Sequence, residues 1–82
     1  MPVQLLYFAS VREAMGRDSE TRDLPTDIIT VGDLADWIEA EGNPIFADRT
    51  KLRAAIDQTM AGFDTPIAGA REIAFFPPVT GG

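Results

Sequence analysis

The residues of this chain that could take part in a reaction lie at its C-terminus, where Gly81 and Gly82 precede a free carboxylate. Glycine has no side chain, so another protein can close around the bare backbone and reach the terminal group. A diglycine alone is also compatible with a frayed tail. Together with the residues before it, the pair predicts a thin probe whose only reactive group is the carboxylate of Gly82.

The remainder of the sequence lacks the usual catalytic side chains, since it contains no cysteine and no histidine. Without a thiol or an imidazole, disulfides, thiolate metal sites and the common pairs of nucleophile and base cannot form. A metal would have to bind carboxylates alone, and no stretch has the spacing of a calcium loop. We therefore predict no bound cofactor and no metal site, although an inert binding module would show the same absences.

Composition limits the choice of partner and compartment. The chain has 82 residues, 13 of them acidic and 7 basic, for a net charge of −6. One small domain fits this length, and its charge repels nucleic acid and anionic membranes, so we expect neither as a partner. No apolar run approaches the length of a membrane span, and the N-terminus lacks the pattern of a signal peptide. We expect a cytoplasmic protein whose partners carry basic patches.

The residues before the diglycine predict how it is presented. Phe76 completes an aromatic pair that is typical of the end of a buried strand, and Pro77 ends that strand because proline donates no hydrogen bond to a sheet. Pro78, Val79 and Thr80 all favour extended backbone. At roughly 3.3 Å per residue, this arm would extend on the order of 20 Å from the domain.

The first half of the chain shows two strands and two helices. Residues 3–9 alternate as a strand that buries one face and leaves Leu6 and Phe8 on the less buried face. Ser10 and Glu13 have the spacing of a capping box and predict a short helix that stops at Gly16. Residues 19–24 are polar enough for an edge strand. Thr30 and an apolar stripe after it predict the main helix.

The second half contains one ambiguous segment and one clear strand. Residues 51–60 fit helical spacing and strand alternation equally well. Residues 72–76 alternate as a strand that places Phe76 away from the core. Because the first and last strands are the most apolar, we expect them in the middle of a mixed sheet, wrapped on one main helix.

Several segments resemble a known family, the small subunits of molybdopterin synthase, which are ubiquitin-like sulfur carriers. The matching segments are Phe75 to Gly82, Tyr7-Phe8-Ala9 with Val11-Arg12-Glu13, and Gln58-Thr59 with Phe63-Asp64 and Pro66. The resemblance implies an α+β, β-grasp domain over residues 1–76, an extended tail over residues 77–82, and a strand in the ambiguous segment.

The resemblance also implies a function for the tail. A ubiquitin-activating-like adenylyltransferase would consume ATP to adenylate Gly82, and sulfur would then replace AMP to give a thiocarboxylate. The tail would enter the large subunit of molybdopterin synthase, in a heterotetramer, and donate sulfur to the cyclic pterin precursor. On this interpretation the chain is a carrier, and catalysis belongs to its partners. Residues expected to bind a partner, besides the tail, share apolar character near its root: Leu6, Phe8, Met60, Phe76, Pro77 and Pro78.

Two other functions stay open from the sequence. A related ubiquitin-like protein could carry sulfur for thiamine, cysteine or tungsten-cofactor synthesis, or could be attached to target proteins. A plain acidic interaction domain would leave Gly82 unmodified. The order of two aromatic residues and two prolines before the tail favours the molybdopterin synthase subunit.

Overall fold

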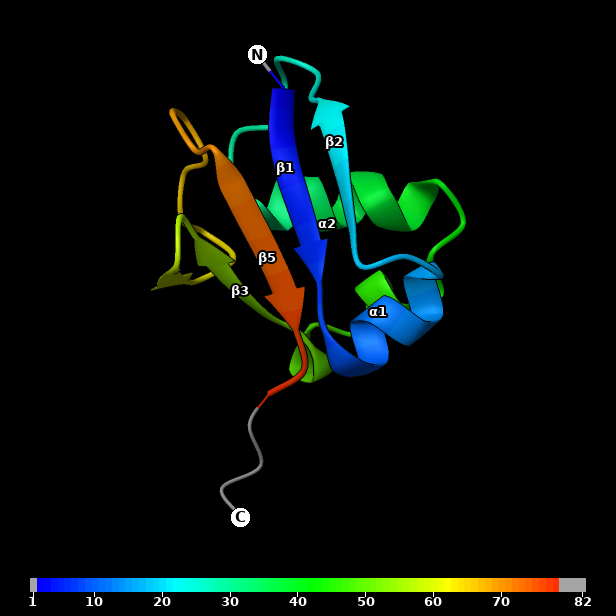
Figure 1. Cartoon of the computed structure of the whole chain (residues 1–82). Helices are drawn as coiled ribbons and strands as arrows, with labels where there is room; N and C mark the ends of the chain where they lie inside the picture. The colour runs from blue at the N-terminus through cyan, green and yellow to red at the C-terminus, as the bar shows by residue number, and fades with distance from the viewer. Residues whose placement is uncertain (1, 79–82) are drawn as a thin grey trace.

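The structure, a computed structural model, describes residues 2–78. Within this range one mixed sheet has the strand order β2-β1-β5-β3-β4 (Figure 1). The strands are β1 Pro2–Tyr7, β2 Ser19–Asp23, β3 Arg53–Ile56, β4 Thr59–Ala61 and β5 Glu72–Phe76. The helices are α1 Ala9–Met15, α2 Val31–Ala40 and the short 3-10 helices η1 Pro44–Ala47 and η2 Arg49–Lys51.

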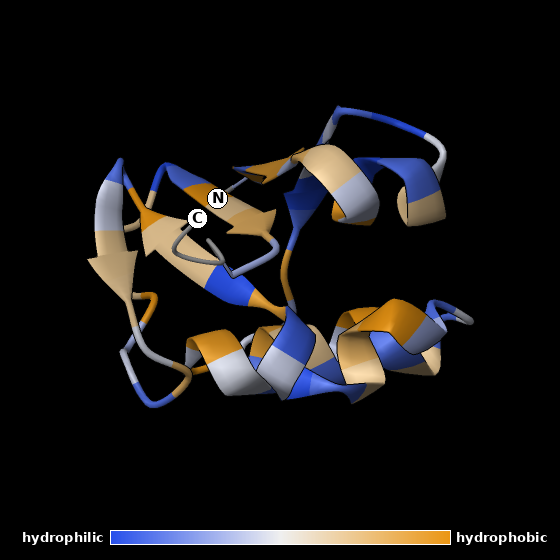
Figure 2. Cartoon of the chain, turned by 90° about the horizontal axis from the view of Figure 1, so that it is seen from below, coloured by the Kyte–Doolittle hydropathy of each residue, from blue (hydrophilic) through white to orange (hydrophobic). Residues whose placement is uncertain are grey.

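The two most apolar strands lie next to each other inside the sheet, as predicted. β5 pairs in parallel with β1 and antiparallel with β3, so both of its edges are hydrogen-bonded. One face of the sheet packs against α2, and Figure 2 shows the sheet and α2 as separate layers. The buried core between the layers is apolar: Val3, Leu5, Tyr7, Val11, Val31, Leu34, Ala35, Ile38, Phe46, Leu52, Ala54, Ile67, Ile73 and Phe75. This arrangement confirms the mixed sheet on one main helix.

Helix α2 begins with the predicted capping box. Asp33 N donates to the Thr30 hydroxyl at 3.1 Å, and Thr30 N donates to the Asp33 carboxylate at 3.2 Å. The same carboxylate also accepts from Ile29 N at 3.1 Å. These backbone donors, that of Ile29 first, lower the pKa of Asp33 because they stabilise its charged form. Three amides at the helix start are thereby satisfied.

Replacing Thr30 by alanine removes one half of this box, so we expect Thr30→Ala to lower the free energy of unfolding by about 1 kcal/mol. Urea denaturation followed by far-UV circular dichroism measures the loss. Thr26→Ala, at an exposed turn residue outside the helix, is the control and should change stability little. Equal stability of the two variants would show that the cap contributes nothing.

Helix α1 begins two residues earlier than the sequence suggests, and the predicted capping box at Ser10 is wrong. The N-cap residue is Phe8, and no side chain caps the helix. The chain turns sharply at Ala9, whose φ is 52°, so the helix follows directly on β1. The Phe8 carbonyl accepts from the amides of Val11 and Arg12 at 3.1 and 3.3 Å. Ser10 therefore lies inside the first turn. The helix ends at Gly16, in the left-handed region, as predicted.

The ambiguous segment 51–60 is a β-hairpin, so the sheet has one strand more than the sequence suggested. β3 and β4 pair antiparallel and are joined by Asp57 and Gln58, both at positive φ, which is the geometry of a two-residue hairpin turn. Tertiary contacts hold this turn. The Asp57 carboxylate accepts from the amides of Arg71 and Glu72 at 3.1 and 3.0 Å.

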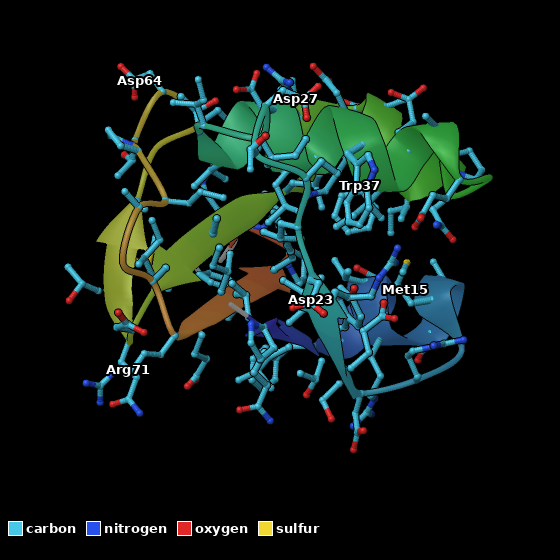
Figure 3. The ribbon with its side chains drawn as sticks, turned by 90° about the horizontal axis from the view of Figure 1, so that it is seen from above. Met15, Asp23, Asp27, Trp37, Asp64 and Arg71 are labelled. Atoms are coloured by element: carbon cyan, nitrogen blue, oxygen red, sulfur yellow. The ribbon has the colours of Figure 1, made fainter. Side chains whose placement is uncertain are left out.

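Strand β2 is an edge strand, as predicted, and a charged network joins it to α2. The Arg22 guanidinium lies 4.4 Å from the centre of the Trp37 ring and donates to the Glu41 carboxylate at 2.6 and 2.8 Å. In Figure 3, Trp37 extends from α2 toward the layer of β1 and β2. Trp37 is half-buried at the rim of the core and is therefore a packing residue.

Candidate functional site

The tail leaves the domain from the end of its central strand. β5 ends at Phe76, and the half-buried Pro77 and Pro78 follow outside any strand, at the lower end of the sheet in Figure 1. Proline ends the ladder here, as the sequence predicts. The predictions for Val79, Thr80, Gly81 and Gly82 lie outside the described residues. The structure describes the base of the tail, which is the end of β5 with Pro77 and Pro78.

Next to this base, the sheet face that does not pack on α2 carries a group of apolar residues. We call this the open sheet face and define it by six residues: Leu6, Phe8, Ala55, Met60, Ala74 and Phe76. Side chains on paired residues of neighbouring strands point to the same face, so the register alone assembles the group. An apolar surface of this kind on a small domain is typical of a binding site.

Pairing places four of these residues in one row across four strands. Leu6 of β1 lies opposite Ala74 of β5, Ala74 lies opposite Ala55 of β3, and Ala55 lies opposite Met60 of β4. Met60 is 64% exposed at the end of the row. Leu6 and Met60 were both expected to bind a partner, and the structure puts them on the same face although the sheet separates them by two strands.

Phe8 and Phe76 lie at the tail end of the same face. The Phe8 amide donates to the Phe75 carbonyl at 3.1 Å, which continues the pairing of β1 with β5 by one residue. Phe8 is 48% exposed, whereas Phe76 is half-buried. The expectation that Phe8, Leu6 and Phe76 point away from the core is therefore met. All described residues predicted to bind a partner lie on the open sheet face or directly after it.

Sequence reasoning missed Ala55 and Ala74 of this surface and Arg53 beside it. Strand alternation puts Ala74 on the same side of β5 as Phe76, but nothing in the sequence showed that Ala55 would lie beside it. Arg53 pairs with Phe76 and is exposed on the same side. The signal for all three is the register between β3 and β5, which a single sequence does not contain because the two strands are far apart along the chain.

The core behind the open sheet face holds it rigid. Phe46 of η1 packs edge to face against Phe75, with ring centres 5.0 Å apart, and against Tyr7 at 6.4 Å. The Tyr7 hydroxyl donates to the Glu20 carboxylate at 2.7 Å. Burial, together with this hydrogen bond and the charge of Glu20, raises the pKa of Tyr7, so the phenol stays neutral and serves packing.

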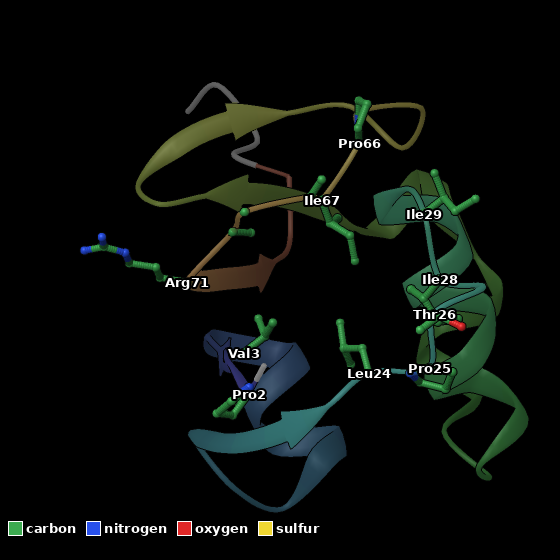
Figure 4. A pocket seen from close by; sticks show the side chains of 13 residues that line it. Pro2, Val3, Leu24, Pro25, Thr26, Ile28, Ile29, Pro66, Ile67 and Arg71 are labelled. Carbon is green, nitrogen blue, oxygen red and sulfur yellow. The ribbon is translucent and has the colours of Figure 1, made fainter.

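Other kinds of site have little support among residues 2–78. This part of the chain contains no group of three metal-ligating side chains. Likewise, none of its helices has the length and apolar character needed to cross a membrane. A hollow of about 620 Å³ is lined by mostly apolar residues, among them Val3, Leu24, Ile29 and Ile67, with Arg71 at one side (Figure 4). It lies where β1 and β5 begin, at the opposite end of these parallel strands from the tail.

Comparison with known proteins agrees with this geometry. A model of the ThiS family matches residues 5–82. The molybdopterin synthase sulfur carrier subunit of Escherichia coli (strain K12) is 39% identical over 82 residues, covering 98% of this chain and 99% of its own. The protein of the same name from Haemophilus influenzae (strain ATCC 51907 / DSM 11121 / KW20 / Rd) is 34% identical, with the same coverage.

Solved structures share the fold. SAMP1 from Haloferax volcanii has a TM-score of 0.73 and 25% identity, and the match covers 100% of both chains. A putative molybdopterin converting factor, subunit 1, from Pyrococcus furiosus has a TM-score of 0.75 and 25% identity, covering 96% of this chain and 99% of the other. These likenesses confirm the ubiquitin-like β-grasp fold. Because the family match spans almost the whole chain, and relatives of equal length share more than a third of its residues, the chain belongs to the ThiS family.

Proposed function

We propose that this chain is the sulfur-carrier subunit of molybdopterin synthase. Relatives with that name match it along their whole length. The observation that carries the proposal is that the family match runs through residue 82, so the diglycine lies inside the matched region. The base of the tail supports it further, because β5 is hydrogen-bonded on both edges and ends at two prolines.

The proposed chemistry takes place on the carboxylate of Gly82. A free carboxylate is a poor acyl donor, because resonance and negative charge resist attack. A ubiquitin-activating-like adenylyltransferase would join it to AMP, with release of pyrophosphate from ATP. A sulfur nucleophile supplied by another protein would then attack the acyl carbon and expel AMP, which leaves a C-terminal thiocarboxylate. The nucleotide thus meets the tail only inside the activating enzyme, and the domain itself binds no cofactor.

In the second half of the cycle, the thiocarboxylate would act as the nucleophile. The tail would enter the large subunit of molybdopterin synthase, where sulfur passes to the cyclic pterin precursor and builds the dithiolene. The carrier would return as a carboxylate, ready for another activation. The described residues provide no general acid or base at the tail base, so proton transfer falls to the partner.

The open sheet face is the proposed docking surface for the large subunit, in a heterotetramer of two carriers and two large subunits. Its apolar residues surround the root of the tail, so docking would aim the tail into the partner. The same face would meet the activating enzyme at a different time. Because the cycle depends on ATP and on these enzymes, we place the protein in the cytoplasm.

The absence of cysteine permits a sharp test of this function. Protein purified from its native host should contain a species that is heavier by the difference between sulfur and oxygen, and a thiol-selective alkylating reagent should modify it once, at Gly82. No other thiol in the chain competes for the reagent, because it has no cysteine. The control is the same protein from a strain that lacks the activating enzyme, purified under equally mild conditions and without hydroxylamine. This protein should stay unmodified.

The other outcomes of this measurement identify the competing functions. Chains joined through Gly82 to lysine residues of other proteins would indicate a protein modifier. A native host that yields only the carboxylate form, even when cofactor synthesis is active, would contradict the carrier function. A thiocarboxylate that forms normally while molybdopterin synthesis is unaffected by loss of the chain would assign it to another sulfur pathway.

A further inference from the structure

One charged residue lies beside the open sheet face at the end from which the tail leaves. Arg53 is directly opposite Phe76 in the antiparallel pair of β3 and β5, so the two side chains share the outward face. The Arg53 side chain is exposed, and its neighbours on that face are apolar. A positive charge therefore adjoins the apolar surface of a protein whose net charge is −6.

No acidic side chain among residues 2–78 neutralises this charge. The ion pairs in this range join Arg17 and Arg22 to Glu20, Arg22 to Glu41, and Arg49 to Asp36. The Arg53 guanidinium instead donates to the carbonyl oxygen of Leu52, at 2.9 Å. Its remaining donors face outward, where an incoming protein would meet them.

The acidic residues on this side of the sheet lie toward the other end of the strands. Glu72 begins β5 and pairs with Gln4, and at roughly 3.3 Å per residue it is about 13 Å along the strand from Phe76. Asp23 pairs with Pro2, at the same far end. The net charge of the chain therefore does not describe the surface beside Phe76, where the paired charged residue is Arg53.

The position of Arg53 also excludes a direct part in the reaction. Gly82 is six residues beyond Phe76, and an extended chain of that length spans on the order of 20 Å. An arginine side chain beside Phe76 is too short to cover this distance. Arg53 can act on docking, but it cannot contact the reacting carboxylate of an extended tail.

We infer that the surface of the large subunit that covers the open sheet face presents an aspartate or glutamate carboxylate to Arg53. The inference rests on the proposed function, because it takes this face as the docking surface. A partner that covers Phe76 must also cover the adjoining guanidinium, and a covered charge without a counter-charge is costly. The planar fork of a guanidinium pairs best with a carboxylate, through two parallel hydrogen bonds.

Such a pair would determine which proteins dock. The apolar residues of the open sheet face would accept any apolar surface of the right shape, whereas Arg53 would reject a partner with a lysine or arginine at that point. The charge expected on the partner at this point is negative, whereas the net charge of the chain alone would suggest a positive one. The carboxylate belongs beside Phe76, at the end of the face from which the tail leaves.

Charge reversal tests the inference with a matched control. Calorimetric titration of the full chain with the large subunit from the same organism should show roughly tenfold weaker binding for Arg53→Glu, and a smaller loss for Arg53→Leu, which removes the charge without repelling the carboxylate. Arg71→Glu is the control, because it changes the net charge equally but lies directly before β5, at the far end of that strand from the tail. The affinity of this variant for the large subunit should match that of the unaltered chain. High salt should reduce the difference between Arg53→Glu and the control.

Phe76→Ala distinguishes a failure of this inference from a failure of the proposed docking surface. If Phe76→Ala weakens binding while Arg53→Glu binds as tightly as Arg71→Glu, the face is the docking surface and the carboxylate assignment is overturned. If neither Phe76→Ala nor Arg53→Glu changes the affinity, the docking surface itself is wrong. Equal thermal melting of all four variants and the unaltered chain shows that folding is not the cause.

Discussion

Gly81→Val should abolish molybdopterin production while leaving the domain folded. On the proposed function the tail passes through a channel of a partner that is shaped for bare backbone, and valine adds a branched side chain next to the reacting residue without removing the carboxylate of Gly82. Production in cells that lack the native gene measures function, and circular dichroism of the purified variant measures folding. Addition of one residue after Gly82 should have the same effect, because it moves the carboxylate out of position.

Ala68→Val is the matched control for this change. Ala68 is exposed in the loop before β5, at the opposite end of that strand from the tail, so the added side chain meets solvent. Cells that carry Ala68→Val should produce as much molybdopterin as cells that carry the unaltered chain. Normal production by Gly81→Val would show that no partner encloses the tail closely. A single-turnover assay with chemically prepared thiocarboxylate would then separate adenylation from sulfur transfer.

The fold was largely predictable because its strongest patterns agree with its topology. High apolar content on both faces marks β1 and β5 as inner strands of the sheet, and each buries one face against α2. The capping box at Thr30 marks the start of α2, because its hydrogen bonds are local and need no distant residue. Local rules succeed where the structure satisfies its polar groups within one turn.

The β3–β4 hairpin could not be predicted from pattern because its turn depends on distant residues. Asp57 and Gln58 adopt positive φ without a glycine, which sequence rules for tight hairpins do not favour. The compensation comes from hydrogen bonds between the Asp57 carboxylate and the amides of Arg71 and Glu72. Only the fold brings these amides next to the turn, so the segment 51–60 stays ambiguous in the sequence alone.

A similar reason explains the wrong prediction at Ser10 and why no pattern marked Phe46 as a core residue. Ser10 has the local sequence of a cap, but the Phe8 amide, directly after β1, donates to the Phe75 carbonyl, and the helix begins at the next residue. Phe46 showed no periodicity that marks it as core, yet it fills the space between Tyr7 and Phe75. In both places a tertiary contact with β5 decides the outcome.

In the candidate site too, local patterns predict some residues, whereas others depend on distant parts of the chain. Period-two alternation was enough to place Phe8, Leu6 and Phe76 on the open sheet face, while Met60 came from the family resemblance. The alanines between them and Arg53 needed the strand register. A surface assembled from four strands is recorded in the sequence only as separate residues, and the sheet order decides which of them are neighbours.

Phe76→Ala should weaken binding of the chain to the large subunit by about 2 kcal/mol or more and leave its stability nearly unchanged. Phe76 lies between the exposed Phe8 and the root of the tail, where an aromatic anchor would be covered completely on docking. Surface plasmon resonance with immobilised large subunit measures the affinity. Urea denaturation of the free chain measures the stability.

The adjacent Phe75 provides the contrasting control, because the two aromatic residues point to opposite faces of β5. Phe75 is fully buried against Phe46, so Phe75→Ala should lower the free energy of unfolding by about 3–5 kcal/mol. If Phe76→Ala destabilises the free chain as much as Phe75→Ala while its partner affinity stays unchanged, Phe76 belongs to the core and the open sheet face has no aromatic anchor at the tail. If the affinity falls with stability intact, the strand buries one aromatic residue for the fold and presents the next to the partner.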